Sequence, residues 1–142
     1  MKTAQANALR ATTLIRSFVE HGVREFVLSP GSRNTPLILA VEAWVAKPGQ
    51  DVRVHRILDE RSAAFFALGL GRASGKPAVL VCTSGTAGAH YLPAVIEAHQ
   101  SCVPMMIVTA DRPPELHGCG SLQTVVQEDF FACFFLCPIG RH

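Results

Sequence analysis

Four short segments of this 142-residue chain combine residue types that bind small anionic or polar molecules. Glu60 follows Asp59 directly and precedes an alanine-rich stretch, which places an acid at a predicted strand-to-helix turn. The small polar loop Thr83-Ser84-Gly85-Thr86-Ala87-Gly88 lets a ligand approach the backbone closely, with free amides at a helix start. Arg33 and Arg112 each carry a guanidinium group that can bind a carboxylate bidentately. Two such arginines at one rim indicate a substrate with more than one carboxylate.

Each of these segments also has a simpler structural explanation. The acids of the Asp59 turn can complement a helix dipole, and the Thr83 loop can be a tight turn without a ligand. Arg112 can pair with a local acid, either Asp111 or Glu115. The loop is neither a Walker loop, because no Gly-Lys-Ser/Thr follows, nor a nucleophile elbow, because Cys82 replaces the first glycine of that motif.

Alternating strands and helices have to position these segments. Apolar periodicity, turn residues and capping residues predict helices over about 3–20, 35–46, 60–73 and 89–100. The strands are predicted at 25–29, 52–58, 77–82 and 103–109, the last two as continuous apolar runs buried on both faces.

This alternation is typical of βαβ units and therefore of an α/β fold with an open parallel sheet and helices on both faces. The carboxyl ends of parallel strands open on one edge of the sheet, and open sheets bind ligands there. We therefore expect Ser32 and Arg33, Glu60, the Thr83 loop and Arg112 to meet at one edge.

The composition excludes several function classes. A net charge of +2 with only 17% charged residues argues against binding to nucleic acid or to an acidic membrane surface. The hydrophobic content of 49% indicates a face meant for another domain or subunit. Without a signal peptide or an apolar run long enough to span a membrane, we expect a cytoplasmic protein. Of the five cysteines, we expect all to be reduced and three to be buried, and neither they nor the histidines show metal-ligand spacing.

The four segments together resemble one family in order and spacing. These motifs are Ser-Pro-Gly-Ser-Arg at 29–33, Asp-Glu-Arg at 59–61, Thr-Ser-Gly-Thr-Ala at 83–87 and Thr-Ala-Asp-Arg-Pro-Pro-Glu-Leu at 109–116, with Gln123 following Gly118-Cys119-Gly120. The chain resembles the N-terminal, pyrimidine-binding domain of 2-succinyl-5-enolpyruvyl-6-hydroxy-3-cyclohexene-1-carboxylate synthases, which are thiamine-diphosphate enzymes of menaquinone biosynthesis.

The resemblance implies a cofactor, two substrates and a role for each motif. Glu60 would be the catalytic acid that hydrogen-bonds the aminopyrimidine ring of thiamine diphosphate, and we expect a dry pocket around it. Thr83, Ser84, Gly85 and Thr86 would complete the cofactor contacts. The substrates would be 2-oxoglutarate, which is decarboxylated, and isochorismate, to which the succinyl unit is added. The isochorismate ligands would be Ser32, Arg33, Arg112 and Gln123.

The resemblance also implies parts that this chain does not contain. Family members are longer, and they bind the diphosphate and its Mg²⁺ or Mn²⁺ ion through a Gly-Asp-Gly…Asn motif in a later domain. We therefore expect a pyrimidine-binding domain at 1–127, an atypical truncated or frameshifted tail at 128–142, and no activity of this chain alone. Full-length members would be homo-oligomers that act on small molecules. The alternatives are the short chain of a two-chain thiamine-diphosphate decarboxylase and a non-catalytic relic or interaction module.

Overall fold

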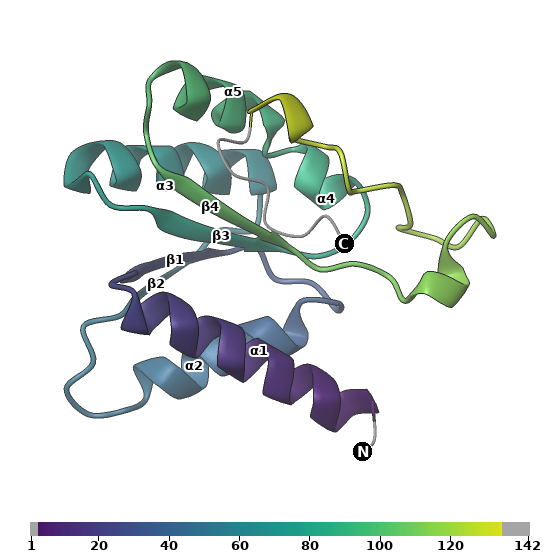
Figure 1. Ribbon diagram of the computed structural model, residues 1–142, viewed down its shortest axis with the longest axis horizontal. Coiled ribbons are helices and arrows are strands. Elements are labelled where there is room, and N and C mark those ends of the chain that lie inside the picture. The colour runs from purple at the N-terminus through teal and green to yellow at the C-terminus, as the bar shows by residue number, and fades with distance from the viewer. Residues whose placement is uncertain (1–2, 135–142) are drawn as a thin grey trace.

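A four-stranded parallel sheet forms the centre of the structure, a computed structural model that describes residues 3–134. The strand order is β2-β1-β3-β4 (Figure 1). The chain therefore adds β2 on one side of β1 and then crosses over to add β3 and β4 on the other side. The strands are β1 (Glu25–Leu28), β2 (Arg53–Arg56), β3 (Ala78–Cys82) and β4 (Met105–Thr109).

Helices cover both faces of this sheet, as the alternating sequence pattern predicts. One face carries α1 (Thr3–Glu20) and α2 (Thr35–Val45), and the other carries α3 (Glu60–Ser74) and α5 (Leu92–Gln100) (Figure 1). The predicted fold class, an open parallel α/β sheet with helices on both faces, is therefore confirmed. The remaining helical segments are α4 (Thr86–Ala89) and the 3-10 turns η1 (Pro114–Leu116) and η2 (Ala132–Phe134).

The apolar residues form two cores, one on each side of the sheet. All five residues of β3 are buried, because this strand has a neighbour on both sides and helices above and below. Ala63, Ala64 and Ala67 let α3 lie close to one face, where Tyr91 is fully buried. Phe26 and the buried residues of α1 fill the other face.

Three predictions made from the sequence are wrong. The strand at 103–109 is half-buried rather than buried, since β4 is at an edge and has only β3 beside it. The helix predicted over 89–100 begins only at Leu92, and the loop predicted before it contains the short helix α4, because Pro93 has no N–H to donate to the preceding turn and α5 starts anew there. Of the four cysteines among the described residues, Cys82 alone is buried, which makes three buried cysteines impossible; Cys137 lies outside them.

The end of the described chain packs against the domain. Phe131 is 5% exposed and belongs to the same core as Tyr91, and a Cβ on Gly88 would lie 3.3 Å from the Phe130 ring. Residues 135–142 of the predicted tail lie outside the described residues. In the part of the chain that is described, none of the helices has the length and apolarity required to cross a membrane.

Candidate active site

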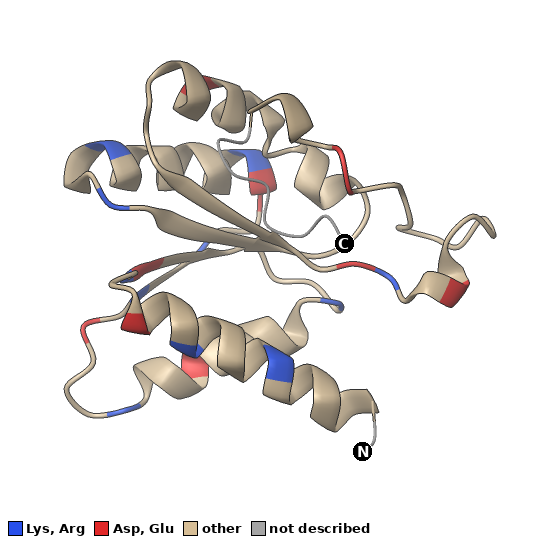
Figure 2. Ribbon diagram, viewed as in Figure 1, with Lys and Arg blue, Asp and Glu red and all other residues tan. Residues whose placement is uncertain are grey.

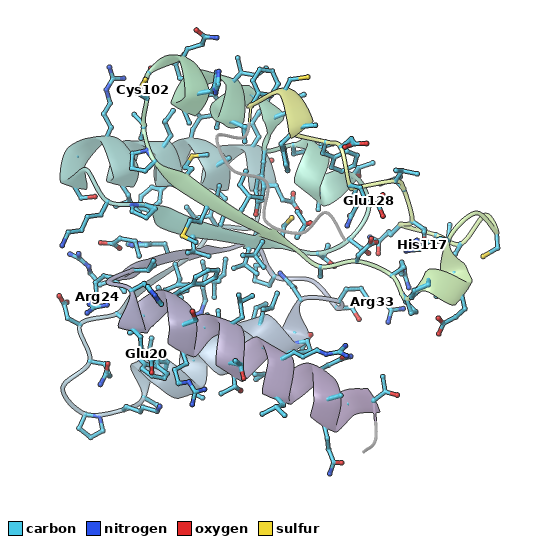
Figure 3. All side chains as sticks on the ribbon, in the orientation of Figure 1. Glu20, Arg24, Arg33, Cys102, His117 and Glu128 are labelled. Carbon is cyan, nitrogen blue, oxygen red and sulfur yellow. The ribbon has the colours of Figure 1, made fainter. Side chains whose placement is uncertain are left out.

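The four sequence segments follow neighbouring strands at one edge of the sheet. The strand register pairs Leu28 with both Arg56 and Val81, and Cys82 with Thr109, so the loops that follow these residues start side by side. Figure 3 shows Arg33 and His117 on the same side of the molecule, where these loops emerge. The parallel register therefore brings the four segments to the carboxyl edge of the sheet, as predicted.

The Ser-Pro-Gly-Ser-Arg loop after β1 is held in shape by Asn34. Its side chain is fully buried; Oδ1 accepts a hydrogen bond from Gly31 N–H (2.8 Å), and Nδ2 donates one to Ser29 O (2.9 Å). Asn34 occupies the N-cap position of α2, but its side chain makes no cap bond because both of its polar atoms bond within the loop. Ser32 and Arg33 consequently lie at an exposed tip on a rigid base.

Glu60 is the first residue of α3, at the turn that follows β2. Asp59 caps this helix: its Oδ1 accepts a hydrogen bond from Ser62 N–H (2.7 Å), and hydrogen bonding to Ser62 lowers the pKa of Asp59. The expected dry pocket is absent from the described structure, since Glu60 is half-buried and the preceding Leu58 is 81% exposed. The Glu60 carboxyl makes no hydrogen bond or ion pair with any described residue.

Two buried groups lie behind Glu60. Burial, and to a smaller extent the charge of the Glu60 carboxylate, raise the pKa of the Cys82 thiol to about 12. Burial likewise raises the pKa of the Tyr91 hydroxyl, and electrostatic interactions with Cys82 and Glu60 raise it as well. The Tyr91 hydroxyl has no partner in hydrogen-bonding geometry within residues 3–134, although Ser29 and Cys82 lie beside it. Glu60 therefore lies between the solvent and the buried, uncharged side chains of Cys82 and Tyr91.

The Ser-Gly-Thr loop after β3 is tied down by a later part of the chain. The buried Ser84 donates from Oγ to Gln123 O (3.1 Å), and Gly85 N–H donates to Gln127 Oε1 (2.9 Å). Gly85 has φ +80°, and a Cβ there would lie 3.0 Å from Gln123 Cα. Thr83 accepts a long hydrogen bond from Arg33 N–H at 3.4 Å. The amides of this loop are thus partly engaged within the chain.

Arg112 lies beside the same later segment. Its Nη2 donates to Leu122 O (2.8 Å), while its Nε is buried and has no hydrogen-bond partner within residues 3–134.

The alternative pairing of Arg112 with a local acid is not found among the described residues. No ion pair joins its guanidinium to Asp111 or Glu115, and Asp111 instead accepts a hydrogen bond from the Arg112 backbone N–H (2.7 Å). Gln123 is exposed and has φ +53°, an uncommon conformation for a residue other than glycine.

An open hollow of about 260 Å³ extends the site toward α1. Arg33 and Asp111 line it together with Arg10 and Asn7, which come from the first half of α1. Neither Arg10 nor Arg33 has an acidic partner in the described structure. No sequence signal distinguishes Arg10, because it resembles any solvated arginine within a helix. Gln127 was missed because its partner Gly85 is 42 residues away in the chain.

The residues present suit one half of thiamine diphosphate. A free carboxyl at an open edge beside a small-residue loop matches what an aminopyrimidine ring requires. The diphosphate end requires a divalent cation, and residues 3–134 contain no group of three or more His, Cys, Asp or Glu side chains that could hold one.

Comparisons with known proteins show the family to which the chain belongs. Residues 10–132 match the family described as thiamine pyrophosphate enzyme, N-terminal TPP binding domain. Three relatives are each named 2-succinyl-5-enolpyruvyl-6-hydroxy-3-cyclohexene-1-carboxylate synthase. They are from Sorangium cellulosum (53% identity over 85% of this chain), Roseiflexus castenholzii (52% over 90%) and Haloarcula marismortui (54% over 92%). The matches span only 19%, 21% and 21% of those relatives, so the chain corresponds to about a fifth of their length. This chain belongs to the thiamine pyrophosphate enzyme family and carries its N-terminal TPP-binding domain.

Proposed function

We propose that this chain supplies the pyrimidine-binding part of a 2-succinyl-5-enolpyruvyl-6-hydroxy-3-cyclohexene-1-carboxylate synthase, a thiamine-diphosphate-dependent transferase of menaquinone biosynthesis. The observation that carries the proposal is the unpartnered carboxyl of Glu60 at the edge that also presents the Ser84-Gly85-Thr86 loop. Relatives at about 50% identity bear this name, which supports extending it to the present chain.

The chain's own residues have separate tasks toward the cofactor. Bound thiamine diphosphate supplies the electron sink needed to decarboxylate a 2-oxo acid. The Glu60 carboxyl forms a hydrogen bond with a nitrogen of the aminopyrimidine ring. Thr83, Ser84, Gly85 and Thr86 line the ring, and Gly85 leaves room because it has no side chain. Rigid attachment of this loop keeps the ring oriented relative to Glu60.

The substrate contacts lie on the neighbouring loops. Ser32, Arg33, Arg112 and Gln123 bind the carboxylates and hydroxyl of isochorismate, and 2-oxoglutarate is the 2-oxo acid that is decarboxylated. The buried, unpartnered Nε of Arg112 supports this assignment, since a buried donor without an acceptor is costly unless a ligand supplies one. The guanidinium geometry suits a carboxylate.

We propose that the remaining parts of the site lie outside residues 3–134. We propose that residues 1–127 form the pyrimidine-binding domain, that 128–142 are a tail, and that Mg²⁺ or Mn²⁺ and the diphosphate are bound by another segment or subunit. The exposed Leu58, next to Asp59 and Glu60, supports an apolar contact there, as in a homo-oligomer. We propose that the protein acts in the cytoplasm on small-molecule substrates.

Calorimetric titration of the purified chain tests the cofactor half of the proposal. Thiamine and thiamine diphosphate should bind with similar affinity, and pyrophosphate should not bind, because the pyrimidine end alone is recognised. Glu60→Gln should weaken thiamine binding about tenfold through loss of a charge-assisted hydrogen bond. The matched control is Glu20→Gln, at the exposed end of α1, which should leave the affinity unchanged. Absence of thiamine binding by a folded chain would contradict the proposal and favour a non-catalytic interaction module.

A further inference from the structure

The segment from Ser121 to Gln127, here called the strap, crosses the carboxyl edge of the sheet. It is attached to the Ser-Gly-Thr loop through Ser84, which donates to Gln123 O at 3.1 Å. It is attached to the loop after β4 through Arg112, which donates to Leu122 O at 2.8 Å. The strap therefore contacts the loop that carries the proposed cofactor contacts and the loop that carries a proposed substrate contact.

Gln127 joins these two loops with one side chain. Its Oε1 accepts from Gly85 N–H (2.9 Å), and its Nε2 donates to Ala110 O (3.0 Å). A glutamine amide can accept and donate at the same time, whereas an ionised glutamate accepts only and a methionine does neither well. The amide is half-buried, so both bonds are partly shielded from competing water.

The backbone around these contacts leaves little freedom for another arrangement. Gly85 is buried, and its approach to the strap is too close for a side chain, with a hypothetical Cβ 3.0 Å from Gln123 Cα and 3.1 Å from its carbonyl carbon. Ala110 follows β4 directly and donates its N–H to Cys82 O (3.0 Å). The two loops therefore start from a fixed point on neighbouring strands, and Gln127 joins them again through Gly85, three residues after Cys82, and through the carbonyl of Ala110.

We infer that Gln127 is a positioning residue, which sets the spacing between the Ser-Gly-Thr loop and the loop of Arg112 through its Gly85 and Ala110 hydrogen bonds. The inference rests on the proposed function, which gives these loops their roles toward cofactor and substrate. A side chain that only stabilised the domain against global unfolding would raise the exchange of all core amides together, because global unfolding is cooperative. A positioning residue acts on the two loops it joins.

The test uses the intact chain labelled with ¹⁵N and three variants. Gln127→Met removes both bonds at similar size, Gln127→Glu keeps the acceptor toward Gly85 and loses the donor toward Ala110, and Gln100→Met is the control at the exposed end of α5. Hydrogen exchange of the Gly85 amide and the chemical shifts of Asp111 and Arg112 are measured without ligand, followed by thiamine binding.

In Gln127→Met, we expect Gly85 exchange to rise about tenfold or more while amides within β3 keep their wild-type rates. The Asp111 and Arg112 resonances should move, and thiamine should bind more weakly. In Gln127→Glu, Gly85 should stay protected while the Arg112 resonance moves. A uniform rise in exchange across the sheet, or no change in either loop, overturns the inference.

The proposed function can fail separately. If the wild-type chain does not bind thiamine, the cofactor role of this edge is wrong. The Gly85 and Arg112 measurements still decide whether Gln127 couples the two loops, because they need no ligand.

Discussion

Gly31 and Thr83 are in direct contact although they belong to loops that follow different strands. A Cβ on Gly31 would lie 2.5 Å from Thr83 Cβ, a separation that two carbon atoms cannot adopt without movement. The same threonine accepts the hydrogen bond from Arg33 N–H. The loop of the proposed substrate contacts Ser32 and Arg33 therefore rests on the loop of the proposed cofactor contacts, with no space for a side chain between them.

Gly31→Ala should destabilise the chain by about 1–3 kcal/mol, because overpacking forces one of the two loops to move. The measurement is urea unfolding followed by circular dichroism. Gly69→Ala is the control: Gly69 is within α3 and has nothing within 4 Å of a hypothetical Cβ, so alanine should stabilise by roughly 0.5–1 kcal/mol. Thr83→Gly should recover part of the Gly31→Ala loss. Equal unfolding midpoints for the two alanine variants would contradict this contact.

Gly85→Ala should be more destabilising than Gly118→Ala. Both glycines have a positive φ, +80° and +70°, so both substitutions carry the conformational cost of about 1–2 kcal/mol. Only Gly85 faces the backbone of Gln123, whereas a Cβ on Gly118 has nothing within 4 Å. The difference in unfolding free energy between the two variants measures the cost of the steric clash between a Cβ at position 85 and the strap. A difference of zero would show that the strap yields without cost.

Cys82 should resist alkylation in the folded chain. Its thiol is buried with a pKa of about 12, whereas Cys102, Cys119 and Cys133 are exposed. Iodoacetamide at pH 8 should modify these three at least about tenfold faster than Cys82, since the thiolate is the reacting form. Peptide mass spectrometry with and without urea measures the difference. Rapid labelling of Cys82 without denaturant would contradict its burial.

The same thiol should weaken the fold at alkaline pH. Because the pKa of Cys82 is raised on folding, the folded chain keeps a proton that the unfolded chain loses above about pH 9. Its contribution to stability is complete below that pH and is lost as the pH rises toward 12. Urea midpoints of the wild type and Cys82→Ala between pH 8 and 10.5 measure the effect; the wild type should decline more steeply.

Asp59 should give the opposite dependence in acid. Its pKa is lowered by hydrogen bonding to Ser62, so its cap is intact above about pH 4, near its ordinary pKa of 3.8, and weakens as the pH falls further. Asp59→Asn keeps the cap without the charge, so its thermal midpoint should fall less between pH 5 and 3 than that of the wild type. Parallel declines in the two proteins would contradict this role.

Tyr91→Phe should be neutral or stabilising by about 1 kcal/mol, because the buried hydroxyl makes no well-formed hydrogen bond with a described residue. Tyr91→Ala should cost roughly 3–5 kcal/mol, since it leaves a cavity beside Ala63 and Cys82 in the core of α3 and α5. Thermal unfolding compares the two. A large loss in the phenylalanine variant would reveal a partner for the hydroxyl.

The sequence predicted those features whose cause is local. The continuous apolar run of β3, the turn at Asp59 and the glycine that ends α1 each follow from neighbouring residues. The burial of β4 was misjudged because central strands and edge strands can have the same apolar sequence. Strand order depends on distant parts of the chain, so the sequence of β4 alone does not show that it lies at an edge. The two hydrogen bonds of the Asn34 side chain, with Gly31 and Ser29, could not be predicted because they depend on the shape of the loop.

The candidate site shows the same limit. Residues at the strand ends could be found because parallel strands bring their carboxyl ends together. Gln127 could not, because its partner Gly85 is 42 residues away in the chain. Arg10 could not, because only the packing of α1 on the sheet places it in the hollow with Arg33.

The two edges of the sheet differ in a way that affects handling of the protein. β2 carries Arg53 and Arg56 along its outer edge, whereas β4 reads Met-Met-Ile-Val-Thr and has no charged residue (Figure 2). Charged side chains on an edge strand discourage pairing with a second molecule, and β4 lacks this protection. At high concentration, molecules should therefore self-associate by pairing their β4 strands edge to edge. Met106→Lys should reduce this aggregation, because it places a charge on the edge strand.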